Sequence, residues 1–487
     1  MVVEILGAKM LSPFVGLSHF VWTAQIAVTL IALACGYYVG GRLADRSPRL
    51  AWLYWAILGA ALYLALTVLI CEPVAYWSLD FNLAVGSLLA SAILFFLPLA
   101  LLAMTGPFLV RMITSSLAGV GGNVGRLTAV STLGSVAGTL FIGYVMVPRL
   151  PNSVTMYLTA VALVLVAASY FVFFRRQSPL SLLLLLLLGS SVGLSALAAR
   201  NREFRVVRGL FRGNSHFGQL QVLDSRDGAC RYYLNDNLIQ NTYDPEAKQS
   251  ESTFTYMLAG LARAYTTNIH DALCIGLGIG IVPMEFARHG VRVDVVEINP
   301  AVVSVAKDFF DFQPAKLRIT IDDGRHFLNG CRSKYDAVIL DAFLGDSSPS
   351  HLLTREAFTA IRRVLKPAGV LVINSFGELQ PGRDFFSASL NNTLKAVFPG
   401  VRAHVSSDGA VFFVAANYSG LHFIRQPDCS AYHPLVQSQA AATFAEIGDI
   451  PADHGRVLTD DFNPVEFYDA RNREGFRRKL ALSTRDW

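Results

Sequence analysis

Apolar residues in the first part of the chain gather in runs long enough to cross a lipid bilayer. A transmembrane helix needs about 20 predominantly apolar residues. Runs of this length occur at 19–40, 50–71, 83–110, 127–147, 153–174 and 180–199. Residues 1–16 predict a further short helix, which Glu4 and Lys9 make too polar to count as a span. We therefore predict a membrane domain at residues 1–199 that contains six or seven helices.

Small residues and prolines add detail to this domain. Proline lacks a backbone donor, so the prolines of the 83–110 run predict a kink or a broken helix. Gly40–Arg46, between the first two runs, predicts a tight basic loop. The fourth run carries a face of small residues suited to close helix packing. This face consists of Ser131, Gly134, Ser135, Gly138 and Gly143.

After residue 200 the pattern changes to short segments with strand and helix periodicities. Residues 200–245 alternate apolar and polar positions as strands do, with turn signals at Asp227–Gly228 and Asn235–Asn237. Residues 250–265 predict an amphipathic helix. Further strands are predicted at Ala272–Ile275, at a segment ending on Glu297, and at Ile319–Ile321, Tyr335–Asp341, Val370–Asn374 and 411–416, with a helix at Leu353–Val364. We predict a small β subdomain at 200–249 and a Rossmann-like α/β domain at 250–487.

A glycine turn follows the first strand of the α/β domain. Gly276, Gly278 and Gly280 stand at alternate positions, where backbone without a Cβ can come close to a ligand. Glu297 follows Gly280 by seventeen residues, at the carboxyl end of the next strand. A carboxylate at this place can accept hydrogen bonds from both hydroxyls of a ribose. An ordinary strand–turn–helix with incidental glycines is the alternative interpretation.

The next two predicted strands also end on acids. Asp322 and Asp323 follow the third strand, and Asp341 ends the fourth. Carboxyl ends of parallel strands line the crevice where open α/β sheets bind ligands. The glycine turn has no P-loop lysine, which argues against a nucleoside triphosphate. An adenosyl compound with a ribose and no phosphates fits these residues better.

Taken in order, these elements resemble the polyamine aminopropyltransferases (spermidine and spermine synthases), a family of S-adenosylmethionine-dependent Rossmann enzymes. The resemblance covers residues 204–377 and is that of a membrane-anchored variant. Besides the glycine turn it is carried by Tyr233–Gln240, Val296–Asn299, Asp323–Gly324 and Leu340–Phe343.

The resemblance implies a role for each of these residues. Asp341 is the general base that deprotonates an attacking amine, which then displaces methylthioadenosine from a sulfonium carbon. Glu297 binds the ribose, Asp323 the adenine amino group, and Gln240 the sulfonium substrate. The remaining binding residues are Gly276, Gly278, Gly280 and Gly324. As the alternative, these acids are helix caps or solvated loop residues.

The same resemblance sets expectations for ligands and partners. The substrate is S-adenosylmethionine or its decarboxylated form, and an amine, or an internal group of the same substrate, is the acceptor. We expect neither a prosthetic group nor a metal. A homodimer in contact with the bilayer is the expected assembly.

The chain departs from the family pattern on the acceptor side. Ile279 stands where the family has an aspartate that holds the aminopropyl amine, and Tyr256 replaces a glutamate. No second acid follows Asp341 within Ala342–Leu344. Loss of the amine-binding aspartate favours intact S-adenosylmethionine, whose carboxylate an acid would repel. Putrescine is expected to be a poor acceptor.

Composition separates a membrane part from a soluble part and excludes other classes. Charged residues make up 16% of the chain, against roughly 25% in soluble proteins, and the first 199 residues hold nine basic and four acidic ones. A net charge of +5 over 487 residues does not indicate nucleic acid binding. The six cysteines form no Cys-x-x-Cys pair, so neither a zinc site nor a disulfide framework is indicated.

Two other functions stay open. A methyltransferase would release S-adenosylhomocysteine, and a transporter or sensor would use the soluble part only to bind a ligand. The tail segment Leu458–Pro464 is either a turn with an aspartate cap or a flap that returns acids to the site.

Two arguments about orientation disagree. Short loops on one side of the membrane hold seven arginines, against five on the side of the soluble part, which favours an external soluble part. A sulfonium substrate made in the cytosol favours an internal one, and we give this argument more weight. We expect an integral protein of the bacterial inner membrane whose soluble domain faces the cytoplasm.

Overall fold

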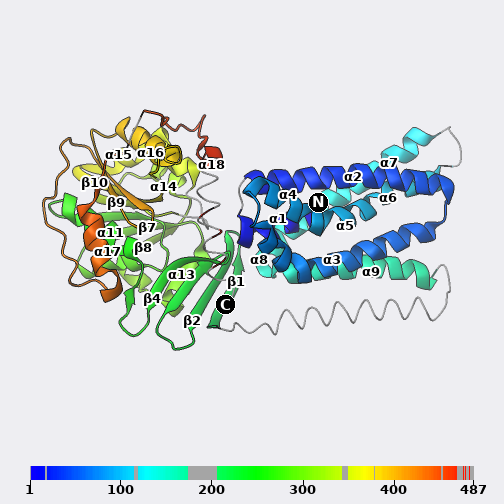
Figure 1. Cartoon of the computed structure of the whole chain (residues 1–487), viewed down its shortest axis with the longest axis horizontal. Helices are drawn as coiled ribbons and strands as arrows, with labels where there is room; N and C mark the ends of the chain where they lie inside the picture. The colour runs from blue at the N-terminus through cyan, green and yellow to red at the C-terminus, as the bar shows by residue number, and fades with distance from the viewer. Residues whose placement is uncertain are drawn as a thin grey trace. The chain divides into compact units, whose positions relative to one another are not determined.

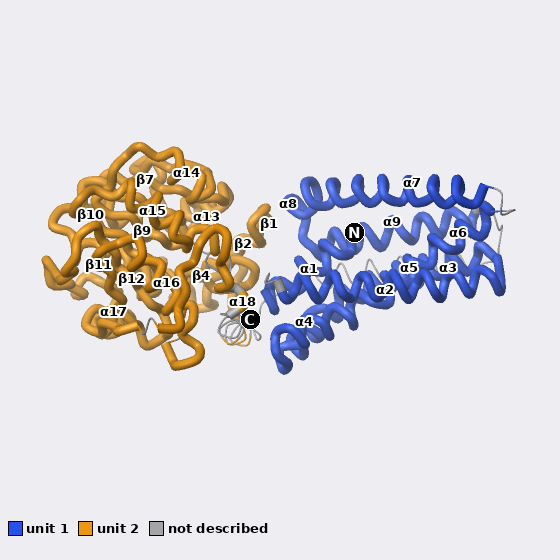
Figure 2. The backbone as a smooth tube through the Cα atoms, turned by 90° about the horizontal axis from the view of Figure 1, so that it is seen from above, with its two compact units in different colours: residues 1–203 blue, residues 204–487 orange. Residues whose placement is uncertain are grey.

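The structure is a computed structural model, and it describes residues 2–16, 19–114, 119–173, 206–342, 349–377, 379–450 and 453–468, with a few isolated positions after these. The chain divides into two compact units, Met1–Glu203 and Phe204–Trp487 (Figure 2). The described residues of the first unit are almost entirely helical, whereas the second contains two β-sheets with helices around them (Figure 1).

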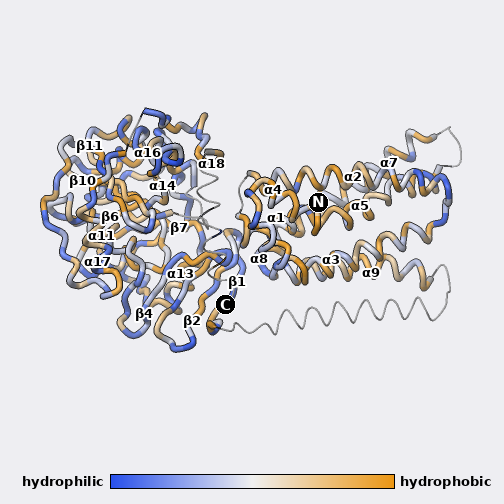
Figure 3. Tube along the Cα trace, viewed as in Figure 1, coloured by the Kyte–Doolittle hydropathy of each residue, from blue (hydrophilic) through white to orange (hydrophobic). Residues whose placement is uncertain are grey.

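Helices of the first unit occur where the apolar runs predict them. The described elements are α1 (Val2–Val15), α2 (His19–Arg46), α3 (Leu50–Ser78), α4 (Leu83–Ser91), η1 (Ala92–Phe96), α5 (Leu97–Ala103), α6 (Thr105–Ile113), α7 (Val120–Phe141), η2 (Ile142–Met146), α8 (Val147–Arg149) and α9 (Asn152–Phe173). They form five stretches that are long and apolar enough to cross a membrane: Phe20–Arg46, Leu50–Ser78, Leu83–Ile113, Val120–Arg149 and Asn152–Val172. Figure 3 shows hydrophobic residues along these helices. The predicted run at 180–199 lies outside the described residues.

The predicted break in the third long stretch is present, and neighbouring side chains compensate for it. Pro98 lies in the first turn of α5 and cannot donate to the carbonyl of Leu94, four residues earlier. Thr67 of α3 donates its hydroxyl to that carbonyl at 3.0 Å, and Tyr63 donates to the carbonyl of Ile93 at 2.5 Å. The π-turn η1 covers the same residues. Because backbone groups in an apolar environment must be satisfied internally, these hydroxyls stabilise the interrupted helix.

The prediction of a loop at Gly40–Arg46 is wrong, because these residues form the last turns of α2. Arg42 donates to the hydroxyl of Tyr38, one turn earlier on the same helix. Arg111 of α6 forms an ion pair with Asp45 at 3.5 Å. Charged residues can belong to the last turns of a long apolar helix, since their long side chains can extend to a polar boundary.

Close packing of the small-residue face of α7 is not observed among the described residues. No α7 side chain is buried. A Cβ added at Gly134 or Gly143 would meet no atom within 4 Å, and one at Gly138 would touch only Val2, at 3.4 Å.

The smaller sheet of the second unit is antiparallel and has the order β1-β2-β3-β4-β5. Its strands are β1 (Val207–Ser215), β2 (Gly218–Ser225), β3 (Arg231–Asn235), β4 (Leu238–Asp244) and β5 (Gln249–Ser250). Asp236 and Asn237 form the β3–β4 turn in the left-handed conformation, with φ of +47° and +62°. Asp and Asn tolerate this conformation better than other side chains, which explains the turn signal in the sequence.

The larger sheet has eight strands in the order β13-β11-β12-β10-β9-β6-β7-β8. Its strands are β6 (Asp271–Ile275), β7 (Arg292–Glu297), β8 (Arg318–Ile321), β9 (Tyr335–Leu340), β10 (Leu365–Phe376), β11 (Gly400–Val405), β12 (Ala410–Ala416) and β13 (Ile447–Gly448). The five strands from β10 to β8 are parallel, and β12, β11 and β13 continue the sheet in antiparallel pairing. This is a Rossmann-like sheet with an antiparallel extension.

Helices cover both faces of the larger sheet. Alternate residues of β6 belong to separate cores, Ala272 and Cys274 to one and Leu273 and Ile275 to the other. The first core includes side chains of α11 (Thr253–Tyr265), α12 (Ile281–Arg288), α13 (Pro300–Phe309) and α17 (Pro434–Ala445). The second includes side chains of α14 (Gly324–Gly330), α15 (Arg355–Val364), α16 (Phe385–Lys395) and α18 (Val465–Tyr468). Short 3₁₀ turns lie at η3 (Pro314–Lys316) and η4 (Ser350–Leu352).

Two strands differ from the prediction. β10 begins at Leu365, whereas the predicted strand begins at Val370, because Lys366–Gly369 has the composition of a helix end; the pairing with β9 shifts register there. β11 is absent from the prediction because Arg402 and His404 interrupt its apolar pattern. His404 is nevertheless buried, and its ring hydrogen-bonds the hydroxyl of Tyr265 at 2.9 Å.

Ion pairs join the amino ends of four neighbouring strands, β10, β9, β6 and β7. The Lys366 ammonium on β10 lies 2.7 Å from the Asp271 carboxylate on β6 and 2.8 Å from that of Asp336 on β9. Arg292 on β7 pairs with Asp271 at 2.7 Å. These contacts hold the pKa of Asp271 below its usual value, chiefly through Arg292 and then Lys366. Burial alone would raise the pKa of Asp336, but Lys366 and the backbone amides of His270 and Asp271 lower it overall.

Gly280→Ala is expected to destabilise the start of α12 more than Gly290→Ala destabilises its end. Both glycines are left-handed, with φ of +85° and +76°, so alanine costs each about 1–2 kcal/mol. At Gly280 the added Cβ would also lie 2.3 Å from the Phe312 ring, whereas nothing lies within 4 Å at Gly290. Overpacking typically adds about 1–3 kcal/mol. Hydrogen exchange of peptides from α12, measured on the full chain, tests this; equal protection losses in both variants would contradict it.

Candidate functional site

A pocket lies along the carboxyl ends of the five parallel strands. It encloses about 1200 Å³, part of which is open to solvent. β7 and β8 contribute Glu297, Asp322 and Asp323, and β9 and β10 contribute Asp341 and Asn374. The glycine turn lies between these groups, after β6. Side chains of the smaller sheet complete the wall: Tyr233, Asn235, Leu238, Ile239, Gln240 and Asn241.

The turn after β6 brings backbone from two strands together. Gly276 has φ +97°, and its amide donates to the Val296 carbonyl at 2.8 Å. A Cβ on Gly276 would lie 2.1 Å from the carbonyl oxygen of Asp341. Glycine at this position therefore permits the approach of Asp341, and not only that of a ligand. Gly278 lines the pocket as predicted, whereas Gly280 does not; it begins α12 against Phe312.

Glu297 ends β7 with a buried carboxylate that the backbone orients. One oxygen accepts from the Leu277 amide at 3.0 Å and the other from the Asn299 amide at 2.8 Å. Burial raises the pKa of Glu297, and these amide hydrogen bonds oppose the rise. Each carboxylate oxygen has a second lone pair, so the fixed carboxylate can still accept from the hydroxyls of a ribose.

Asp323 serves as a helix cap and also lines the pocket. One oxygen accepts from the amides of Arg325 and His326, in the first turn of α14, at 2.8 and 3.1 Å. The other lies 2.9 Å from Nε2 of His351. Burial alone would raise the pKa of Asp323, but the His326 amide and His351 lower it overall. Asp323 is therefore a helix cap, as the alternative interpretation proposed. Because it also lines the pocket, its contact with an adenine stays a prediction.

Asp341 lies deep in the pocket directly after β9. Its amide donates to the Ile275 carbonyl at 3.0 Å, which fixes it beside the glycine turn. One carboxylate oxygen accepts from Nδ2 of Asn374 at 2.9 Å. Burial raises the pKa of Asp341 to about 6, and the Asn374 hydrogen bond opposes this rise. A carboxylate with this pKa can hold and release a proton near neutral pH.

Most of the predicted site residues lie together, but the prediction misses several neighbours. Gln240, Gly276, Gly278, Glu297, Asp323, Gly324 and Asp341 all line the pocket. Asn374 is absent from the predicted site. It lies near the carboxyl end of β10, and the argument that placed the acids at the carboxyl edge of the sheet applies to it as well. His351 carries no local signal, since its contact with Asp323 depends on tertiary structure.

The tail acids lie elsewhere. Asp460 accepts from Thr354 at 2.6 Å and from Arg325 at 3.0 Å, and its amide donates to Glu356 at 3.0 Å. It therefore ties the tail to the start of α15, and neither it nor Asp461 is among the described residues that line the pocket. The interpretation as a flap over the site is not supported.

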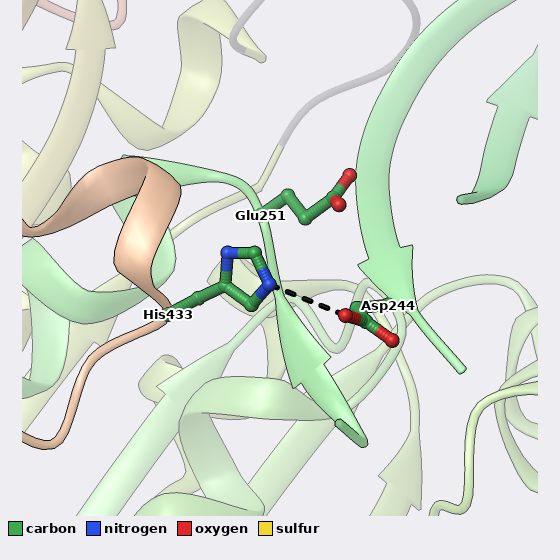
Figure 4. Close-up of side chains that lie close together, drawn as sticks. All are labelled: Asp244, Glu251 and His433. Atoms are coloured by element: carbon green, nitrogen blue, oxygen red, sulfur yellow. Dashed lines mark hydrogen bonds and ion pairs between the residues drawn. The ribbon is translucent and has the colours of Figure 1, made fainter. Parts of the chain in front are cut away.

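A second group of polar side chains, Asp244, Glu251 and His433, has donor types that suit a metal ion (Figure 4). Hydrogen bonds within the protein account for it. Nδ1 of His433 accepts from the Leu435 amide at 3.3 Å, so the ring proton is on Nε2, which lies 3.3 Å from Asp244. Glu251 accepts from the thiol of Cys230 at 2.9 Å. A metal on Nε2 would require the proton to move to Nδ1, against the Leu435 amide.

The sheet topology defines a Rossmann-like domain, and the row of acids beside a glycine turn lies at the sheet edge where such domains bind their ligands. Comparison with known proteins is more specific. A family model described as "Spermine/spermidine synthase domain" matches residues 251–406. The polyamine aminopropyltransferase of Clostridioides difficile (strain 630) is 30% identical over 208 residues, covering 40% of this chain and 70% of that protein. The chain belongs to the polyamine aminopropyltransferase family.

Other similar proteins match this chain over a smaller share of their length or at lower sequence identity. The polyamine aminopropyltransferase of Vibrio vulnificus (strain CMCP6) is 38% identical over 140 residues, 27% of this chain and 46% of that protein. An N-terminal histidine N-methyltransferase of Emericella nidulans is 30% identical over 215 residues, 39% of this chain and 37% of that protein. The chain thus spans less than half the length of these two relatives. The spermidine synthase structure from Thermotoga maritima has 18% identity and a TM-score of 0.40, covering 50% of this chain and 85% of that one.

Glu297→Gln is expected to weaken binding of methylthioadenosine by about 1.5–3 kcal/mol, because a neutral amide replaces a charge-assisted acceptor. The variant amide would also direct a donor toward the amide of Leu277 or Asn299. Titration calorimetry on the full-length protein measures the loss. Asp294→Asn is the matched control, because Asp294 lies on the same strand but outside the pocket, where it accepts from Tyr335. Unchanged affinity in Glu297→Gln would remove this residue from the ligand site.

Proposed function

We propose that the protein is a membrane-integrated enzyme of the aminopropyltransferase type. It cleaves a sulfonium substrate at the propyl carbon next to sulfur and releases methylthioadenosine. The observation that carries this proposal is the position of Asp341, in the same pocket as Glu297 and Asp323 and beside the turn at Gly276. The family relationship supports the same reaction class.

Each residue has a defined part in this reaction. Glu297 accepts from the ribose hydroxyls, and Asp323 binds the adenine amino group at the neighbouring strand end. Gln240 contacts the sulfonium substrate from the smaller sheet, with backbone of Gly276, Gly278 and Gly324 alongside. Asp341 takes a proton from the attacking ammonium, because only the neutral amine has the lone pair needed for displacement.

The decarboxylated form of S-adenosylmethionine is the better substrate candidate. Among the described residues that line the pocket there is no lysine or arginine, and His351 is already paired with Asp323. A substrate carboxylate would therefore lack a cationic partner, and burying an unpaired charge is costly. This argument outweighs the loss of an acid at Ile279, which favours the intact form.

The first unit is proposed to anchor this enzyme in a membrane. Five described stretches have the length and apolar composition of transmembrane helices. We place the second unit on the cytoplasmic side of a bacterial inner membrane, because the sulfonium substrate is made there. A homodimer is the proposed assembly.

A methyltransferase is the second candidate, favoured by the similarity to the Emericella nidulans enzyme. Product analysis separates the two functions. After incubation of the purified protein with either sulfonium substrate and a mixture of amines, mass spectrometry should detect methylthioadenosine. S-adenosylhomocysteine as the product would establish the methyltransferase instead, and the absence of both products would favour a binding protein.

Asp341→Asn is expected to reduce methylthioadenosine release by roughly 10²–10⁴-fold while sulfonium-substrate affinity stays within a few-fold of wild type. Asparagine keeps the shape of the side chain but cannot accept the proton. Single-turnover release and calorimetry, measured on the same preparation, separate catalysis from binding. If release continued at the parental rate, Asp341 would not be the base.

Asn374→Leu is expected to move the acidic limb of the pH–rate profile upward by roughly one pH unit, the equivalent of one charge-assisted hydrogen bond. Asp341 acts as a base only when ionised, so activity should fall as the pH drops through about 6. Loss of the Asn374 donor destabilises the carboxylate, and its pKa rises further. Ser375→Ala is the control, because Ser375 donates to the Val411 carbonyl and not to Asp341. An unmoved limb in Asn374→Leu would show that this hydrogen bond does not tune the base.

A further inference from the structure

We propose that the amine acceptor is a primary monoamine with an apolar body, and not a diamine such as putrescine. This inference rests on the proposed function and specifies the substrate class of the same pocket. It follows from the order in which the strands present their side chains, from the hydrogen bonds of Asn374, and from the absence of charge on one side of the described pocket.

The order of the strands divides the pocket into successive parts. Read across the sheet as β8-β7-β6-β9-β10, the strand ends present Asp323, Glu297, the glycine turn, Asp341 and Asn374. Adenine and ribose occupy the β8 and β7 side, so the sulfonium lies near the glycine turn. An attacking amine must approach the carbon next to sulfur while it contacts the base. It therefore lies at the ends of β9 and β10.

Asp341 and Asn374 together form a site for one ammonium group. Asn374 is 4% exposed, and its Nδ2 donates to the Asp341 carboxylate at 2.9 Å. Its Oδ1 is buried without a hydrogen-bond partner. A buried acceptor without a donor is costly, and Oδ1 belongs to a side chain that lines the pocket. A primary ammonium held between Oδ1 and the carboxylate would satisfy both.

Next to this pair the described residues of β10 and of the segment after β9 add apolar side chains to the wall. Phe376 follows Asn374 by two residues on β10, so both side chains lie on the same face of the strand. Ala342 follows Asp341, and both it and Phe376 line the pocket. Asp341 is the one acid contributed by β9 and β10 among the described lining residues; the others belong to β7 and β8. The described residues at this end of the sheet therefore offer no second acid to pair with the second ammonium of a diamine, and burying an unpaired charge costs far more than burying a methyl group.

The reaction balances with a monoamine. The acceptor ammonium transfers one proton to the Asp341 carboxylate and becomes a neutral amine. Its lone pair forms a C–N bond with the methylene carbon next to sulfur as the C–S bond breaks. The bonding electrons go to sulfur, which leaves as the neutral thioether methylthioadenosine. The product is a secondary ammonium, and Asp341 later returns its proton to solvent.

The test compares n-butylamine with putrescine, which has the same carbon chain and one more amino group. The full-length protein is incubated with decarboxylated S-adenosylmethionine and each amine, and methylthioadenosine release is measured alongside a sample without amine. We expect kcat/KM for n-butylamine to exceed that for putrescine at least about tenfold, given the cost of an unpaired buried charge. Equal or better use of putrescine would overturn the inference while leaving the proposed function intact.

Two other results have distinct meanings. Release that is equally fast without any amine would assign the acceptor to an internal group of the substrate, which overturns the monoamine inference but not sulfonium cleavage. No release under any condition would contradict the proposed function itself.

Phe376→Asp tests for a gain of function: with an acid beyond Asn374, use of putrescine relative to n-butylamine should rise several-fold. Phe376→Asn, similar in size but neutral, should not raise it, and an equal rise in both variants would contradict a charge effect.

Discussion

The chemistry of this protein depends on one close approach between backbone segments of two neighbouring strands. The carbonyl oxygen of Asp341 lies where a side chain on Gly276 would have to be. The amide of Asp341 is bound in turn by the carbonyl of Ile275. These contacts fix Asp341 against the glycine turn in the wall of the pocket. The strands on either side then set the distances to Glu297 and Asn374 through ordinary parallel pairing.

The smaller sheet supplies the part of the pocket wall that the larger sheet does not. Its strands β3 and β4 supply Tyr233, Gln240 and Asn241 to the pocket wall. Arg231 attaches it by donating to the Phe309 carbonyl at 2.7 Å, and Tyr243 donates to Asp311 at 2.9 Å. These two contacts join the smaller sheet to the end of α13 and to the residues just beyond it. The ligand pocket is therefore enclosed by two separately hydrogen-bonded sheets.

Local patterns predict those parts of the structure that local chemistry determines. The glycine turn, the strands before Glu297, Asp323 and Asp341, and the long apolar helices follow from periodicity and from acids at strand ends. The prediction fails where tertiary contacts decide. Lys366–Gly369 has the composition of a helix end, yet pairing with β9 draws it into β10. His404 is polar in sequence but buried against Tyr265. Likewise, the contact of His351 with Asp323 joins residues 28 positions apart and has no local signal.

Asp341, at the carboxyl end of the central sheet, and the paired acids Asp271 and Asp336, at the amino end, have opposite environments, and this sets the order in which these three gain protons. Burial raises the pKa of Asp341, at the carboxyl end, to about 6 because it disfavours the charged form. At the amino end the pKa values of Asp271 and Asp336 are lowered by Lys366 and its neighbours. Their contribution to stability is present above the usual pKa of an aspartate and is lost only as the pH falls through their lower folded-state values. Mild acidification therefore neutralises the Asp341 carboxylate while the ion pairs that join β6, β9 and β10 are still intact. A fall in pH through about 6 thus changes the charge of the pocket while these ion pairs persist.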